Sequence, residues 1–150
     1  MLVGALVVGF GGAACTANIH DNTLTVDHPN VNFDTDVDVQ SITAGQAIPV
    51  KLSADHVFLC DPNTPPPAEH KDDAGHFQIY LDETGGDPIV ITAQASVNVT
   101  IPAATPPGPH KLICRVHHHD GTPTEGSKEI AITVKASASV TVGTHPDAGG

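Results

Sequence analysis

The chain has 150 residues, which is enough for one well-filled domain and too few for two. Its 17 acidic residues against 6 basic ones give a formal net charge of −11, so a phosphate backbone would repel it and we expect no nucleic-acid partner. Aromatic residues make up only 3% and Trp is absent, so the core must be built from Val, Ile, Ala and Leu.

The first segment, Met1 to Ala14, is an apolar run that ends in small residues and contains no charged side chain. This pattern is typical of a secretory signal, and the run is too short to span a bilayer comfortably. Its end, Gly12-Ala13-Ala14-Cys15, resembles the lipobox of bacterial lipoproteins, in which the Cys is acylated after cleavage. The resemblance implies export to the periplasm or cell surface and a lipid anchor on Cys15. An ordinary signal peptide cut nearby is the alternative.

The rest of the chain shows no helical periodicity, and short β-branched runs separated by turn residues predict strands instead. Eight strands are expected: Thr23–Val26, Val37–Ile42, Ile48–Ser53, His76–Asp82, Ile89–Thr92, Ser96–Ile101, His110–His117 and Lys128–Lys135. Seven or eight strands within residues 23–136 predict an all-β domain, a Greek-key two-sheet sandwich of the immunoglobulin-like or cupredoxin-like kind. Residues 1–15 would be the signal, 16–22 a linker, and 137–150 a partly disordered tail.

Alternation along two of these strands assigns their side chains to faces of the sheet. In the strand His76–Asp82, the side chains of His76, Gln78 and Tyr80 are expected to point outward, away from the core. In the strand His110–His117, Cys114 is expected to face the core and His117 to point outward. The two outward histidines should therefore share one face of the sheet if the strands are neighbours.

The expected topology brings several imidazoles to one end of the sandwich. The strand that begins at His76 should lie antiparallel beside the strand that ends at His117, so the start of one meets the end of the other. The long loop from Asp55 to Gly75 emerges at this same end, and its Pro-rich part, Asp61–Asp73, is either functional or merely mobile. Six histidines would then converge there: His56, His70, His76, His117, His118 and His119.

Two or three imidazoles within a few ångströms of one another would bind Cu²⁺, Zn²⁺ or Ni²⁺. We predict a metal site formed by His76, His117, His118 and His119 that holds copper or zinc. The alternative interpretation is that a His-His-His-Asp run at a strand end is simply a polar turn. His110, at the opposite end of its strand, is expected to be structural.

The chain has 3 cysteines, an awkward number in an oxidising compartment. If Cys15 carries lipid, Cys60 and Cys114 remain as one possible pair. A Cys on an early loop and a Cys inside a late strand are also what an immunoglobulin-like sandwich uses to join its sheets. We therefore predict a Cys60–Cys114 disulfide.

The stretch Pro107–His117, followed by Gly121 and a strand that ends in Ile132-Thr133-Val134, resembles the C-terminal copper loop of cupredoxins. That family places its first His upstream, where this chain has Ala74-Gly75-His76. Parts of the chain are also similar to small uncharacterised domains of bacterial lipoproteins, in the Gly-His strand start and the Pro-Gly-x-His strand.

The cupredoxin resemblance implies copper ligation by His76, Cys114 and His117. No Met follows these residues, so the axial position would fall to His119, a backbone oxygen or nothing. A disulfide sulfur cannot serve as the copper thiolate, so Cys114 is a ligand only if it is reduced, and the two interpretations exclude each other.

The remaining motifs carry little chemistry. Asp34, Asp36 and Asp38 alternate in a way that suggests calcium, but an EF-hand loop requires Gly and Glu where this chain has Val39 and Gly45. No nucleophile elbow, phosphate-cradling loop or His-Glu-x-x-His is present, so we expect no catalytic activity. Two functions remain: a metal-binding, lipid-anchored surface protein, or a structural or adhesive module with a disulfide and no metal.

Overall fold

The computed structural model describes residues 28–136. The expected signal peptide, the linker, the strand at Thr23–Val26 and the tail 137–150 lie outside the described residues. Nine strands are present: β1 (Val31–Asp34), β2 (Ile42–Thr43), β3 (Ala47–Ala54), β4 (Phe58–Leu59), β5 (Ala74–Leu81), β6 (Val90–Thr92), β7 (Ser96–Thr100), β8 (Gly108–His118) and β9 (Pro123–Lys135). The only helical element between residues 28 and 136 is a 3₁₀ turn, η1 (Ala68–His70), inside the Pro-rich loop.

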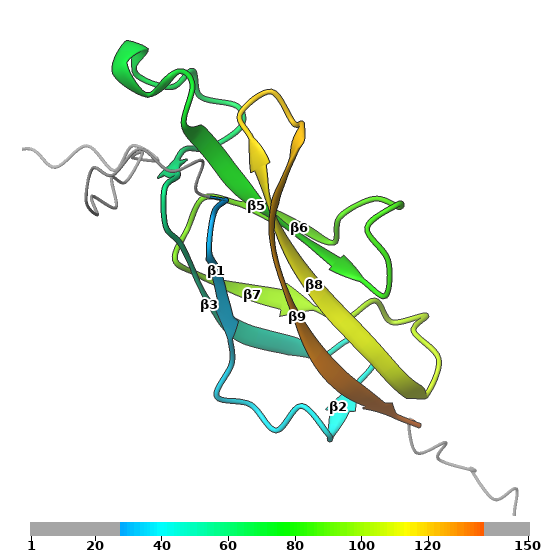
Figure 1. Ribbon diagram of the computed structural model, residues 1–150. Coiled ribbons are helices and arrows are strands. Elements are labelled where there is room, and N and C mark those ends of the chain that lie inside the picture. The colour runs from blue at the N-terminus through cyan, green and yellow to red at the C-terminus, as the bar shows by residue number, and fades with distance from the viewer. Residues whose placement is uncertain (1–27, 137–150) are drawn as a thin grey trace, which may run out of the picture.

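These strands form two sheets packed against each other (Figure 1). The smaller sheet has the order β1-β3-β7, and the larger has the order β2-β9-β8-β5-β4, with β6 also paired to β5. All pairs are antiparallel except β2 with β9 and β4 with β5. The prediction of an all-β two-sheet sandwich is confirmed, with nine strands where eight were expected.

The core lies between the sheets and is mostly aliphatic, as the low share of aromatic residues requires, with Phe33 and Phe77 as its aromatic members. β3 alternates cleanly, with Ile48, Val50 and Leu52 buried and their neighbours turned outward. From the larger sheet, Phe77 and Ile79 of β5 enter the same cluster. Burying each such side chain contributes about 1.5–3 kcal/mol, so this alternation is what fixes the register of the strands.

One predicted strand, Val37–Ile42, is wrong except for its last residue. The backbone turns there because the Asp38 carboxylate accepts the N–H of Gln40 at 3.0 Å and the Asp38 carbonyl accepts the N–H of Ser41 at 3.2 Å. Such local acceptors favour a turn over a strand. The prediction also missed β1, which lies before this turn, and the two-residue strand β4.

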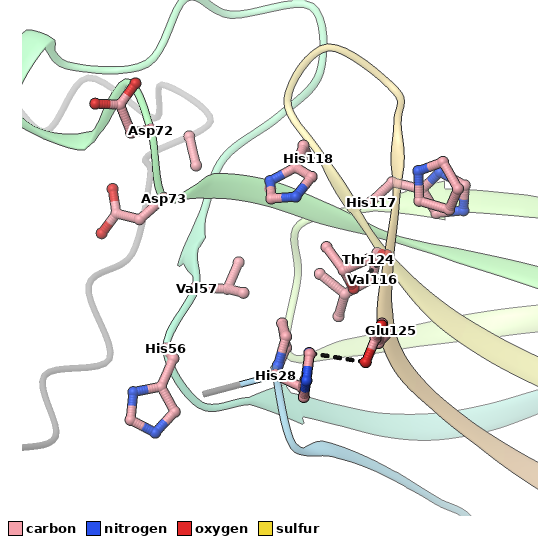
Figure 2. Close-up of a pocket in the computed structure, with 14 residues that line it drawn as sticks. His28, His56, Val57, Asp72, Asp73, Val116, His117, His118, Thr124 and Glu125 are labelled. Atoms are coloured by element: carbon pink, nitrogen blue, oxygen red, sulfur yellow. Dashed lines mark hydrogen bonds and ion pairs between the residues drawn. The ribbon is translucent and has the colours of Figure 1, made fainter. Parts of the chain in front are cut away.

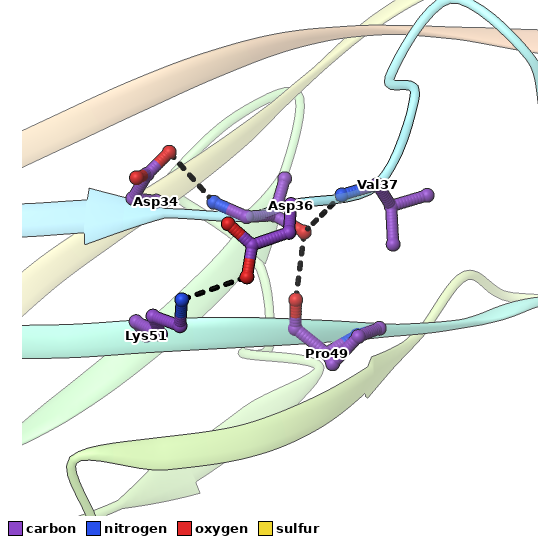
Figure 3. A network of polar contacts seen from close by, with 6 residues as sticks. Asp34, Asp36, Val37, Pro49 and Lys51 are labelled. Carbon is purple, nitrogen blue, oxygen red and sulfur yellow. Dashed lines mark hydrogen bonds and ion pairs between the residues drawn. The ribbon is translucent and has the colours of Figure 1, made fainter.

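Each of the three alternating aspartates accepts a hydrogen bond or forms an ion pair within this chain. Asp36 pairs with Lys51 at 2.7 Å, and Asp34 accepts the N–H of Thr35 at 2.8 Å (Figure 3). Asp38 is occupied by the turn described above. All three side chains are exposed, as expected for carboxylates on a solvent face.

Candidate metal site

β5 and β8 lie side by side and antiparallel, and His76 stands directly opposite His117 in their register. The two rings face each other with centroids 6.1 Å apart and an angle of 27° between their planes. The predicted pairing of these two sequence-distant strands is therefore confirmed. We call the end of the sandwich where β5 begins and β8 ends the site end.

Both rings are buried although they lie on the outer face of the larger sheet: His76 is 1% exposed and His117 is 7% exposed. A second, small cluster of buried residues, formed by Phe58, Cys60 and Ala74, lies on the same face. The ring of His70, in the Pro-rich loop, stacks on Phe58 with centroids 3.8 Å apart and planes 6° apart. The Pro-rich loop therefore packs over this end of the outer face and removes it from water.

A row of polar side chains surrounds the two rings. Along β5, Gln78 Nε2 lies 3.1 Å from His76 Nε2, and Gln78 Oε1 lies 2.5 Å from the Tyr80 hydroxyl. Across the strands, the same hydroxyl lies 3.2 Å from His117 Nε2, and His117 Nδ1 lies 2.9 Å from the carbonyl oxygen of Gly121. Both nitrogens of His117 are thus engaged by the protein.

Two ring nitrogens at this end have no protein partner. Among residues 28–136, His76 Nδ1 and His119 Nδ1 are buried and make no hydrogen bond. Burial, together with the charges of His117 and His119, lowers the pKa of His76 to about 4, and the nearby Asp61 opposes the shift. His76 is therefore a neutral imidazole at physiological pH, and neutral imidazole is the form that ligates metals.

His119 follows His117 past the end of β8 and is held by its backbone, whose N–H donates to the Ala74 carbonyl at 2.9 Å. A cavity of about 450 Å³ opens beside it, between the Pro-rich loop and the hairpin that joins β8 to β9. Its lining includes Pro66, Asp72, His119 and Asp120. The site end is therefore reachable from solvent on the side of His119.

His118 is exposed and alternates with its neighbours, so it extends away from His76. It lines the 450 Å³ cavity together with His119, and also a second cavity of about 360 Å³ that it shares with His56, Asp73 and Glu125 (Figure 2). In that cavity His28 forms an ion pair with Glu125 at 3.0 Å. Of the predicted quartet, His76 and His117 face each other, and His118 and His119 border the 450 Å³ cavity.

The predicted Cys60–Cys114 disulfide is wrong. Cys114 is a free thiol in the core between the sheets, whereas Cys60 is disulfide-bonded and belongs to the cluster on the outer face. The body of the larger sheet separates the two sulfurs. The third cysteine, Cys15, lies outside the described residues.

The ligand set implied by the cupredoxin resemblance does not form either. Cys114 is fully buried and its burial raises the pKa of the thiol to about 12, so it carries no thiolate at neutral pH. Its side chain faces the core, and that of His117 faces the opposite side of the sheet. A single ion cannot contact both.

Within residues 28–136, no three His, Cys, Asp or Glu side chains are arranged as a complete metal site. What the structure brings together is the facing pair His76 and His117 with a hydrogen-bonded row beside it, and His119, which acts electrostatically on His76 and has a second unpartnered nitrogen. The sequence prediction had placed Gln78 and Tyr80 on the face of His76 but had given them no role.

Comparison of the sequence with protein-family models and with curated proteins finds no match. In the part of the chain that the structure describes, no helix is long and apolar enough to cross a membrane.

Proposed function

We propose that this β-sandwich binds a transition-metal ion, with copper preferred, and that the Nδ1 atoms of His76 and His119 are its protein ligands. The proposal includes export, for which the signal-like first segment is the support. The observation that carries the metal site is the pair of buried, unpartnered ring nitrogens.

A buried polar atom without a partner costs about 1–3 kcal/mol, so native proteins rarely leave two of them together. A cation bound by both rings would remove this cost at each of them. Imidazole nitrogen suits copper, zinc and nickel, and copper binds most tightly among the divalent ions of this series. Water can complete the coordination, and the Asp61 carboxylate, which acts electrostatically on His76, is a further candidate ligand.

The alternative is a structural or adhesive module that binds no metal. It rested on a Cys60–Cys114 bond between the sheets, which is not formed. Two unpartnered ring nitrogens support the metal site, whereas the bond that supported the alternative is not formed.

Calorimetric titration of the exported chain with Cu²⁺ tests the proposal, with two adjacent histidines as a matched pair. His119→Gln should weaken copper binding about tenfold or more because it removes a ligand, and His118→Gln should leave it unchanged because its side chain alternates away from that of His76. Electron paramagnetic resonance should show coupling to imidazole nitrogens and no thiolate character. Equal losses in the two variants, or no binding by the unmodified chain, would refute the site.

A further inference from the structure

A single row of hydrogen-bonding atoms links the backbone of the β8–β9 hairpin to His76. It runs from the Gly121 carbonyl to His117 Nδ1 at 2.9 Å, and from His117 Nε2 to the Tyr80 hydroxyl at 3.2 Å. It continues through the Gln78 amide, which lies 2.5 Å from Tyr80 and 3.1 Å from His76 Nε2. We call this row the relay.

The direction of each bond in the relay follows from its first member. A carbonyl oxygen can only accept, so His117 Nδ1 must carry a proton and donate it to Gly121. In a neutral imidazole the other nitrogen, Nε2, is then a bare acceptor. The Tyr80 hydroxyl must donate to it, and this uses the only proton of that hydroxyl.

Because Tyr80 has no second proton, its oxygen must accept from Gln78. The amide nitrogen of Gln78 therefore belongs beside Tyr80 and the amide oxygen beside His76, which is a half-turn of the amide that exchanges two atoms at nearly the same positions. The amide oxygen then accepts a proton from His76 Nε2. A neutral His76 that is protonated on Nε2 keeps a bare lone pair on Nδ1.

The reverse direction is less favourable. It requires a proton on both nitrogens of His117, which places a cation on a buried ring whose two hydrogen-bond partners are a carbonyl and a hydroxyl. It also leaves a protonated His76 Nδ1 buried without an acceptor, at a cost of about 1–3 kcal/mol. The forward direction avoids both costs.

We propose that His117, Tyr80 and Gln78 are positioning residues that hold His76 in the Nε2-protonated tautomer and so present its Nδ1 lone pair to the metal. The inference rests on the proposed function, since it explains how the ligand atom of that site is selected. It also reassigns His117 from ligand to support. Partners of this kind, hydrogen-bonded to the far nitrogen of a ligating His, typically change metal affinity 10- to 100-fold.

The tautomer can be read without any metal, so the relay is tested independently of the proposed function. Nitrogen-15 NMR of the metal-free chain at neutral pH distinguishes a protonated Nε2 from a protonated Nδ1. The relay requires the proton of His76 on Nε2 and that of His117 on Nδ1. A proton on Nδ1 of His76 would overturn it, whether or not the chain binds copper.

Variants at Gln78 connect the tautomer to the metal. Gln78→Met keeps the shape but offers no acceptor, so copper affinity should fall about tenfold and the His76 tautomers should mix. Gln78→Glu restores an acceptor for Nε2–H and should keep affinity within about threefold of the unmodified chain. Gln40→Met, which removes an amide that bonds Thr133 far from the site, is the control.

Circular dichroism would establish that each variant is folded before its affinity is compared. Equal affinities for the Met and Glu variants at position 78 would contradict a positioning role. If the unmodified chain fails to bind copper while His76 carries its proton on Nε2, the proposed function fails and the relay survives.

Discussion

Each end of the β5–β8 pair holds a histidine, but the hydrogen bonding of the two differs. Beyond the far end, His110 Nδ1 lies 2.8 Å from the Asp82 carboxylate and its Nε2 lies 2.8 Å from the Pro106 carbonyl, so both nitrogens are satisfied. At the site end, His76 and His119 each keep one buried nitrogen without a protein partner. The same residue type thus completes the fold at one end and leaves bonding capacity unused at the other.

The pKa values of the histidines at the two ends are shifted in opposite directions. The hydrogen bond to Asp82 raises the pKa of His110, so the folded protein favours its charged form. Burial lowers the pKa of His76 to about 4, so the folded protein favours its neutral form. A neutral ring with a free nitrogen suits a ligand, and a charged ring with two partners suits a structural tie.

The largest effect should come from the close backbone packing at the site end. A Cβ on Gly75 would lie 2.5 Å from the carbonyl oxygen of His117, so Gly75→Ala should destabilise the protein by about 3 kcal/mol in urea unfolding. Gly85, in the loop at the opposite end, has open space around the same position. Gly85→Ala should change stability by less than about 0.5 kcal/mol, and comparable losses would mean the two ends are packed alike.

The next effect is the response of metal-free protein to pH. Because the folded-state pKa of His76 is depressed, protons bind the unfolded chain more readily, and stability should fall by on the order of 2 kcal/mol as the pH drops from about 6.5 to about 5. Thermal unfolding in a chelating buffer measures the slope. His76→Phe should flatten it, and an unchanged slope in that variant would assign the loss to other groups.

The smallest effect on stability should come from removing the contact between Asp82 and His110 at the far end. Asp82→Asn is the suitable change because Asp82 has φ 66° and Asn tolerates that left-handed conformation. Burial alone would raise the pKa of Asp82, but hydrogen bonds from His110 and the Lys111 amide lower it overall. Removing the carboxylate should cost about 1 kcal/mol, with copper affinity unchanged.

The sign of that effect depends on both partners. The contribution of His110 to the free energy of unfolding is complete below pH 6.5 and is lost as the pH rises through the raised pKa of the folded state. The contribution of Asp82 is complete above pH 3.8 and is lost as the pH falls through its lowered pKa in the folded state. The cost of Asp82→Asn should therefore be greatest between these limits. The exposed Asp87, changed to Asn in the same loop, serves as control. A cost that is independent of pH would remove the ion pair from the explanation.

Alternation in the sequence was enough to predict the features that depend on one strand or on a pair of strands. The outward row His76, Gln78 and Tyr80 and the inward Cys114 are where the period of two places them. The same alternation already opposed a copper site shared by Cys114 and His117, and the structure agrees with the alternation rather than with the family resemblance.

Features that depend on loops could not be predicted in this way. His76 was expected to point outward, yet it is 1% exposed because the Pro-rich loop folds over that face, and nothing in the local pattern of β5 reports on a segment that precedes it. The position of His119 is set just past the end of β8, where the hairpin begins and strand periodicity no longer applies. The pairing of Cys60 likewise depends on the outer-face cluster that it joins just after β4 ends.

The spacing of Cys114 and His117 has a consequence for how such proteins diversify. Three residues is an odd number of steps along an extended strand, so thiol and imidazole are assigned to opposite sides for as long as the strand stays regular. Adding or removing one residue between Cys114 and His117 would place their two side chains on the same face of the sheet. A one-residue insertion or deletion there could thus exchange an oxidation-resistant interior sulfur for a sulfur-ligated redox centre, within an otherwise unaltered scaffold.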